Sequence, residues 1–69
     1  MPEISDEMLS DAYSAIKDFI LCYDADSIMM ALESLDEYHL SDYDRKKADD
    51  IRDALSTLDW ECLRSIMQM

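Results

Sequence analysis

The chain contains no glycine and a single proline, which stands at position 2. The remainder of its 69 residues therefore holds no helix breaker, and the β-branched runs that a sheet needs are missing as well. We predict an all-α chain on these grounds. The lack of glycine also excludes the glycine-rich loops that cradle phosphate groups in nucleotide-binding proteins.

Long apolar runs are absent too. No stretch approaches the roughly 18 residues that a membrane span needs, and no charged segment followed by an apolar one has the pattern of a cleaved leader. We therefore expect a soluble, cytoplasmic protein with no membrane partner. The cysteines are few: Cys22 and Cys62 both fall in predicted helices, which favours buried, reduced packing residues, with a disulfide or a reactive thiol as the alternative.

Basic residues are scarce and unevenly placed, and the formal net charge is −11. Residues 1–44 hold twelve acids and one base, Lys17, whereas residues 45–69 hold five acids and five bases. Such a field repels nucleic acid and anionic lipid, attracts basic surfaces and keeps the chain in solution. We expect a protein partner, no nucleic-acid partner, and a monomer or weak dimer.

One short pattern occurs twice, thirty-five positions apart: Tyr23-Asp24-Ala25-Asp26-Ser27-Ile28 and Leu58-Asp59-Trp60-Glu61-Cys62-Leu63. In each copy an apolar residue closes one helix, the first acid caps the next helix, and the second acid lies in its positively polarised first turn. Apolar residues keep the same register around both copies, as in Ile16 with Ile51, Ile20 with Leu55, and Leu32 with Met67. The pattern predicts an antiparallel four-helix bundle built from two tandem helical hairpins with a 35-residue internal repeat.

We expect one domain over residues 1–69, with a frayed lead-in at 1–5, a first hairpin at 6–39 and a second at 41–67. Helices are predicted over about 6–22, from the Asp24 joint to about 38, over about 42–57 and over about 60–67, with Ser5 and Ser41 as further caps. The predicted core stripes are Met8, Ala12, Ala15, Ile16, Phe19, Ile20 and Tyr23; Ile28, Ala31, Leu32, Leu35 and Tyr38; Tyr43, Ala48, Ile51, Leu55 and Leu58; and Leu63, Ile66 and Met67. Trp60 is predicted to anchor the second hairpin, the alternative being an exposed interface residue.

No residue pattern indicates a catalytic or metal site. Phosphotransfer domains place their histidine in mid-helix, with a lysine three residues later and a glycine four residues later, whereas Leu40-Ser41-Asp42-Tyr43 follows His39. His39 is therefore predicted to be a turn residue near the C-terminal end of its helix. The acid pairs at 24/26 and 42/44 lack the glycine and closing glutamate of a calcium loop, and no cluster has zinc spacing. We expect no enzyme activity, no metal and no cofactor.

Four segments together resemble a known family: Phe19-Ile20-Leu21-Cys22-Tyr23-Asp24-Ala25-Asp26-Ser27-Ile28, Leu32-Glu33-Ser34-Leu35-Asp36-Glu37-Tyr38-His39-Leu40, Ile51-Arg52-Asp53-Ala54-Leu55 and Leu58-Asp59-Trp60-Glu61-Cys62-Leu63. Their apolar spacing and acid joints are similar to those of a small helical domain near the C-terminal end of bacterial hybrid sensor histidine kinases and response regulators. The resemblance implies a cytoplasmic, non-catalytic accessory module of two-component signalling. Its partner would be a receiver or kinase module, in the same chain or in another.

We expect the module to act by docking, with the acidic first hairpin steering a basic surface. The candidate contact residues are Tyr13, Met29, Met30, Glu33, Asp36 and Glu37. The basic run Arg45-Lys46-Lys47 is predicted to answer neighbouring acids, the alternative being a dock for an acidic partner. Two other functions stay open: a stand-alone acidic inhibitor or adaptor that binds a basic partner surface, and a degenerate histidine phosphotransfer domain.

Overall fold

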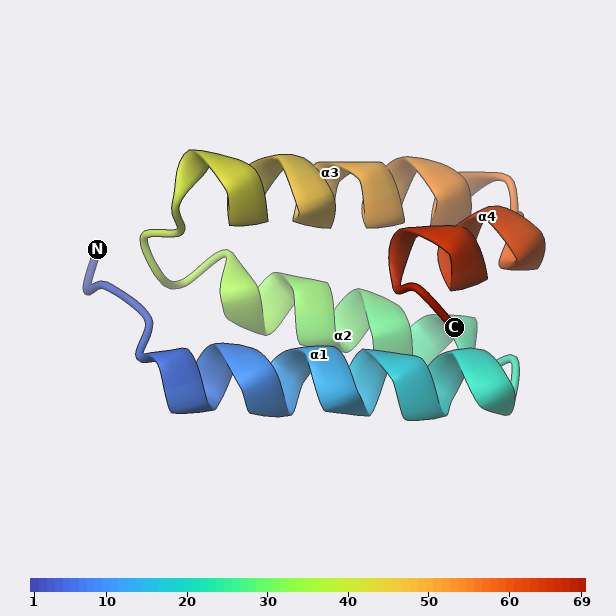
Figure 1. Cartoon of the computed structure of the whole chain (residues 1–69), viewed down its shortest axis with the longest axis horizontal. Coiled ribbons are helices and arrows are strands. Elements are labelled where there is room, and N and C mark those ends of the chain that lie inside the picture. Colours follow the sequence, from blue (N-terminus) through green and yellow to red (C-terminus); the bar gives the residue numbers. More distant parts are fainter.

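The computed structural model describes residues 1–69 and contains four helices and no strand. The helices are α1 (Asp6–Leu21), α2 (Ala25–Leu35), α3 (Asp42–Ser56) and α4 (Trp60–Ile66). In Figure 1, α1 and α3 run in one direction while α2 and α4 run back. The all-α prediction is confirmed. None of these helices is both long and apolar enough to cross a membrane.

Every helix begins at a predicted capping residue. A side-chain oxygen of the cap accepts a hydrogen bond from the backbone N–H three residues later, and the caps are Ser5, Asp24, Ser41 and Asp59. The Ser27 hydroxyl also donates to Asp24 Oδ2 at 2.7 Å. This hydrogen bond and the one from the Ser27 N–H lower the pKa of Asp24 from its ordinary value, because both favour the ionised carboxylate.

Three helices end in the same way although no glycine is present. The residue that follows the cap has a left-handed backbone, with φ of 55° at Tyr23, 52° at Leu58 and 58° at Gln68. After α1, the Tyr23 N–H donates to the Ile20 carbonyl at 3.1 Å and the next N–H donates to the Phe19 carbonyl at 2.9 Å. The ends of α3 and α4 repeat these two bonds. The arrangement is a Schellman motif, whose left-handed position glycine usually occupies.

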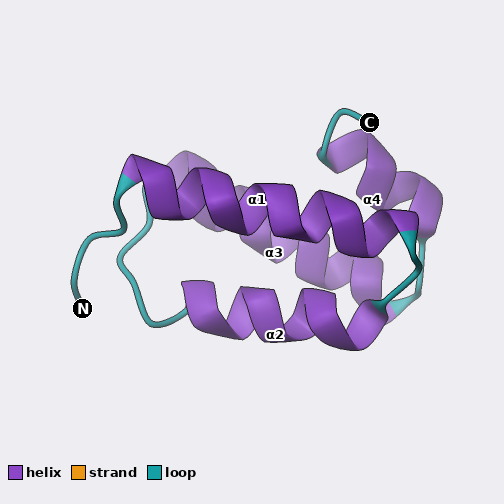
Figure 2. Cartoon of the chain, turned by 90° about the horizontal axis from the view of Figure 1, so that it is seen from below, coloured by secondary structure: helices purple, strands orange, loops and turns teal.

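The helices contact one another around a ring, α1 with α2, α2 with α3, α3 with α4 and α4 with α1. Figure 2 shows α1 and α2 lying side by side, joined by a short turn. The interior holds only apolar residues, and these are Ile16, Ile20, Ile28, Leu32, Leu35, Leu40, Ala48, Ile51, Ala54, Leu55, Leu63 and Met67. Trp60 is partly buried and packs against this core, as predicted.

Several predicted core positions are wrong. Met8, Tyr23, Tyr43 and Leu58 are exposed. Met8 and Tyr43 lie in the first turns of α1 and α3, and Tyr23 and Leu58 follow the ends of these two helices. The second helix ends at Leu35, about three residues before its predicted end. Leu40 lies beyond that end and is buried, which the helical pattern did not predict.

Both cysteines also differ from expectation. Cys22 and Cys62 are free and exposed, so the prediction of buried packing residues is wrong. Cys22 follows the last residue of α1, and its Sγ donates to the Asp18 carbonyl at 3.0 Å. A residue at such a helix end lies outside the apolar stripe, which explains its exposure.

The segment before α1, residues 1–5, is hydrogen-bonded to the turn that follows α2. The Ile4 N–H donates to the His39 carbonyl at 3.4 Å, and the His39 N–H donates to the Pro2 carbonyl at 2.7 Å. The segment that we expected to fray is therefore paired with the backbone at His39. His39 itself is exposed and lies in the turn between α2 and α3.

Candidate functional site

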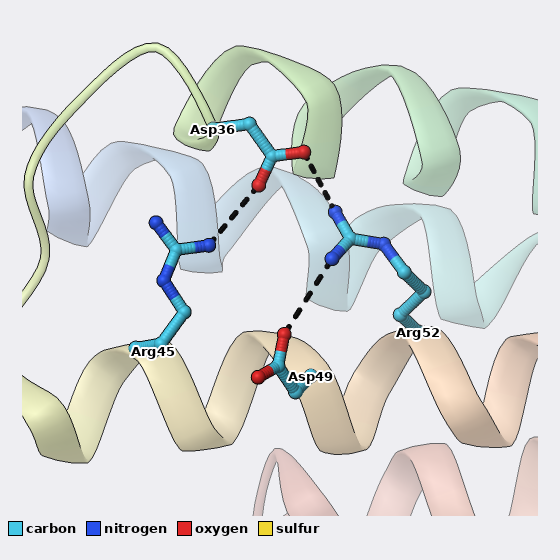
Figure 3. Close-up of polar contacts among 4 residues, drawn as sticks. All are labelled: Asp36, Arg45, Asp49 and Arg52. Carbon is cyan, nitrogen blue, oxygen red and sulfur yellow. Dashed lines mark hydrogen bonds and ion pairs between the residues drawn. The ribbon is translucent and has the colours of Figure 1, made fainter.

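The arginines of α3 are engaged within the fold. Asp36, which ends α2, receives Arg45 Nη1 on Oδ1 at 3.2 Å and Arg52 Nη2 on Oδ2 at 3.0 Å (Figure 3). Arg52 Nη1 also lies 3.5 Å from Asp49 Oδ1 on its own helix. These contacts join the end of α2 to α3, so the Asp36 charge is compensated by bases of the same chain.

Most other bases also have intramolecular partners. Lys46 Nζ lies 3.1 Å from Asp50 Oδ2, and Lys47 Nζ lies 4.7 Å from the centre of the Tyr13 ring. The guanidinium carbon of Arg64 lies 5.8 Å from the centre of the Tyr23 ring. The two ring contacts, those of Lys47 and Arg64, stabilise a cation without a carboxylate. Lys17, on α1, is the one base that makes no ion pair or ring contact.

Most acids of α1 and α2, unlike the bases, have no partner within the chain. Apart from Asp24, which caps α2, and Asp36, their carboxylates make no ion pair and accept no hydrogen bond. They are exposed, and they are Asp6, Glu7, Asp11, Asp18, Asp26 and Glu33, together with Glu37 in the turn after α2. Steps of three, four and seven residues place Glu7, Asp11 and Asp18 on one face of α1. A step of seven residues places Asp26 and Glu33 on one face of α2, and Glu37 follows in the turn after this helix.

Two shallow hollows adjoin on this hairpin. One, of about 250 Å³, lies between α1 and α2 and is lined by Phe19, Ser27, Met30, Ala31 and Ser34. The other, also of about 250 Å³, is lined by Met30, Glu33, Ser34 and Glu37. Met30 and Ser34 line both, so a mainly apolar hollow and an acidic hollow share one wall. We call the seven lining residues together the Met30 face.

Three of the predicted contact residues, Met30, Glu33 and Glu37, come together on the Met30 face. Met30 is 67% exposed. Met29 is partly buried against the core, and Asp36 is held by the two arginines of α3. The structure therefore brings together only half of the predicted set.

Tyr13, the remaining predicted contact residue, lies apart from the Met30 face. Its hydroxyl donates to Asp44 Oδ1 of α3 at 2.7 Å, under the Lys47 ammonium. Burial, together with the hydrogen bond to Asp44, raises the pKa of Tyr13 above its ordinary value. The residue thus joins α1 to α3.

Sequence reasoning missed Phe19, Ser27, Ala31 and Ser34 as members of this face. Phe19 and Ala31 were assigned to the core stripes, and they do pack against the core, but one side of each also lines the seam between α1 and α2. The available signal was their position at the edge of the stripe beside small serines. No three His, Cys, Asp or Glu side chains are grouped so as to hold a metal ion.

The largest hollow, of about 350 Å³, lies on the other side of α1 beside Tyr13, with Lys17, Lys47 and Asp6 among its lining residues. Its lining carries charges of both signs, two lysines and one aspartate. The Met30 face differs because all its charges are negative.

No protein-family model matches this chain, and the comparisons with curated proteins and with solved structures gave no match.

Proposed function

We propose that this chain is a non-catalytic protein-interaction domain that docks on a basic surface of a partner protein through the outer face of α1 and α2. The observation that carries the proposal is the unequal use of charge. The bases of α3 have partners within the same chain. Most acids of the first hairpin, by contrast, are exposed and make no ion pair. The outer face of the hairpin therefore presents uncompensated negative charge to a partner.

The charges of Glu33 and Glu37 do not help the fold. Both carboxylates line one hollow, so two like charges lie near each other. Glu37 also follows the C-terminal end of α2, where the helix dipole disfavours an acid, and no base compensates it. A docking role gives these acids a function, because complementary charge steers encounter with a basic partner and selects against acidic ones.

We also propose that the four helices form an antiparallel bundle of two tandem hairpins related by the 35-residue repeat. The matching joints support this: Tyr23 and Leu58 have nearly equal φ, and Asp24 and Asp59 cap the next helix by the same hydrogen bond. Burial supports it as well, since both members of the pairs Ile16/Ile51, Ile20/Leu55 and Leu32/Met67 are in the core. In this description the first hairpin is the docking half and the second is its support.

The cellular setting that we propose is bacterial two-component signalling in the cytoplasm, as an accessory domain of a hybrid histidine kinase or response regulator. The four segments quoted above, which resemble a domain of those proteins, support this setting. The partner would then be a receiver or kinase module. Direct phosphotransfer is disfavoured because His39 lies in a turn rather than in mid-helix.

A second candidate is a stand-alone acidic inhibitor or adaptor that covers a basic surface, and the net charge of −11 favours it. Both functions use the same acidic hairpin and differ in the partner. Titration against purified receiver domains and against purified nucleic-acid-binding proteins separates them. Binding to receivers alone supports the signalling role, whereas binding to the nucleic-acid-binding proteins alone supports the inhibitor.

Docking itself is tested with poly-lysine as the probe. We expect salt-sensitive binding that is weakened in the double variant Glu33→Gln/Glu37→Gln. The matched control is Asp53→Asn/Glu61→Gln, which removes two exposed, unpaired acids from the second hairpin. Equal affinities of the two double variants, measured by titration calorimetry at low and high salt, would overturn the proposal.

A further inference from the structure

We infer that the segment recognised by the Met30 face is a basic amphipathic helix. One of its apolar side chains enters the hollow between Phe19 and Met30, and a lysine or arginine on the same face meets Glu33 and Glu37. This inference rests on the proposed docking function and specifies the chemistry of the partner.

The sizes of the two hollows favour side chains as their occupants. Each measures about 250 Å³, below the roughly 300–1,000 Å³ of most small-molecule pockets. The first hollow is lined by the Phe19 ring with Ala31 and Met30. The adjoining hollow adds the carboxylates of Glu33 and Glu37. An apolar group and a cation must therefore arrive together, a short distance apart.

A helix presents side chains in this way. Residues three or four apart on a helix have Cβ atoms about 5–6 Å apart and project in the same direction, so one can fill each hollow. An added β-strand would need an open sheet edge, and this structure has no sheet. A helix laid along the seam between α1 and α2 instead uses the ordinary packing of helix against helix.

The composition of the face agrees with such a partner. Met30 is exposed and unbranched, and methionine adapts its shape to apolar side chains of a partner. Ser27 and Ser34 are small, which allows the backbone of another helix to come close. Glu33 and Glu37 have no intramolecular cation, so charge complementarity selects a basic helix over a neutral or acidic one.

Two synthetic peptides of identical composition test the inference. In one, leucines recur at three- and four-residue steps and lysines flank them; in the other, the same residues are permuted so that no apolar face forms. We expect the full chain to bind the amphipathic peptide about tenfold more tightly than the permuted one, because burial of one apolar side chain is worth that factor. Titration calorimetry gives both affinities.

Met30→Ala is the decisive variant, and Leu21→Ala is its matched control. Leu21 is 68% exposed and lies on α1 outside both hollows, whereas Met30 is 67% exposed. Alanine keeps helix propensity, and circular dichroism verifies that both variants are folded. We expect Met30→Ala to lose most of the preference for the amphipathic peptide and Leu21→Ala to retain it. Chemical-shift changes at Phe19 and Ala31 on addition of the amphipathic peptide provide a second measurement.

The variants also separate the two proposals. Equal peptide preference in Met30→Ala and Leu21→Ala, with no shift change at Phe19, would overturn the helix inference. Docking by charge would still stand if Glu33→Gln/Glu37→Gln weakened the binding of both peptides. If that double variant bound both peptides as the unmodified chain does, both proposals would fall.

Discussion

The ring of Tyr23 meets the ring of Trp60 edge-on, with the centroids 5.1 Å apart and the planes inclined at 87°. Tyr23 follows α1 and Trp60 begins α4, so the contact joins the two helix joints at one end of the molecule (Figure 1). Arg64 of α4 lies over the same tyrosine ring. These contacts explain why a tyrosine is tolerated in a left-handed position that glycine usually occupies.

Leu58 occupies the corresponding left-handed position after α3, and its side chain is 56% exposed. We expect Leu58→Gly to stabilise the protein by about 1 kcal/mol, because glycine adopts this conformation without steric cost. Tyr23→Gly gains the same relief but loses a ring pair worth about 0.5–1.5 kcal/mol, so its net effect is near zero or destabilising. Urea denaturation of the two variants measures the difference.

Leu58→Ala serves as the control for this comparison. Alanine keeps the strained backbone and removes the same side chain, so no stabilisation is expected. If Leu58→Gly proved less stable than the unmodified chain, the leucine side chain would contribute more than the backbone strain costs.

The hydrogen bond from Tyr13 to Asp44 predicts a stability change at alkaline pH. The pKa of Tyr13 is raised above the ordinary value of 10.0, first by burial and then by Asp44, so the folded chain holds the phenolic proton more tightly than the unfolded chain does. The stabilisation is therefore complete below about pH 10 and is lost as the pH rises through the folded-state pKa. We expect the stability difference between the unmodified chain and Tyr13→Phe to shrink above about pH 10.

At neutral pH, Tyr13→Phe removes a hydrogen bond to a charged group in a partly exposed site, and we expect a loss of about 1 kcal/mol. Tyr38→Phe is the control, since the Tyr38 hydroxyl has no hydrogen-bond partner, and its stability should follow the pH profile of the unmodified chain. Denaturation at a series of pH values supplies both curves. If Tyr13→Phe and the unmodified chain had the same stability at every pH, the hydrogen bond from Tyr13 to Asp44 would contribute nothing to stability.

The helix boundaries were predictable from the sequence to the extent that they depend on local chemistry. Ser5, Asp24, Ser41 and Asp59 cap helices because each bonds a backbone N–H only three residues away, a distance that a sequence reports directly. The core was predictable where residues lie in the middle of helices, as Ile16 and Ile51 do.

Several errors occur where the outcome depends on residues distant in sequence. Tyr43 is an exception, because it lies five residues before Ala48, off the three- and four-residue steps of the buried stripe of α3, and its side chain is 70% exposed. Tyr13 was predicted as a contact residue because its partner Asp44 is 31 positions away and nothing local indicated the pair. Asp36 was assigned to the docking surface for the same reason, since Arg45 and Arg52 belong to another helix.

Asp36 should therefore affect stability rather than docking. Its pairs with Arg45 and Arg52 are partly exposed, and such pairs are worth about 0.2–1 kcal/mol each. We expect Asp36→Asn to destabilise the protein by about 1 kcal/mol, less at high salt, because the asparagine lacks the charge that both arginines meet. Urea denaturation at two salt concentrations measures this.

Asp11→Asn is the matched control, because Asp11 is exposed, makes no ion pair and lies beyond the first turn of α1. Combining Asp36→Asn with Arg52→Gln closes a double-mutant cycle, which should return a favourable coupling energy between these two residues. A stable Asp36→Asn variant that bound the amphipathic peptide more weakly would instead place Asp36 in contact with the partner.

For Glu37 we expect the reverse of Asp36, since its replacement should weaken docking and increase stability. Its carboxylate follows the C-terminal end of α2, where a negative charge is unfavourable, and it lines the same hollow as Glu33. We expect Glu37→Gln to stabilise the fold by about 0.3–1 kcal/mol while weakening the binding of lysine-rich peptides. A residue that costs stability and increases affinity is one retained for binding, which is the behaviour that the docking proposal requires.

Glu7→Gln provides the matched comparison, since it removes the same charge from the first turn of α1, where a helix favours an acid. We expect this variant to be less stable than the unmodified chain by about 0.3–1 kcal/mol, opposite in sign to Glu37→Gln. Thermal and urea denaturation give the two signs, and peptide titration gives the affinities. Destabilisation by Glu37→Gln would mean that Glu37 serves the fold, because removing a purely unfavourable charge cannot weaken it.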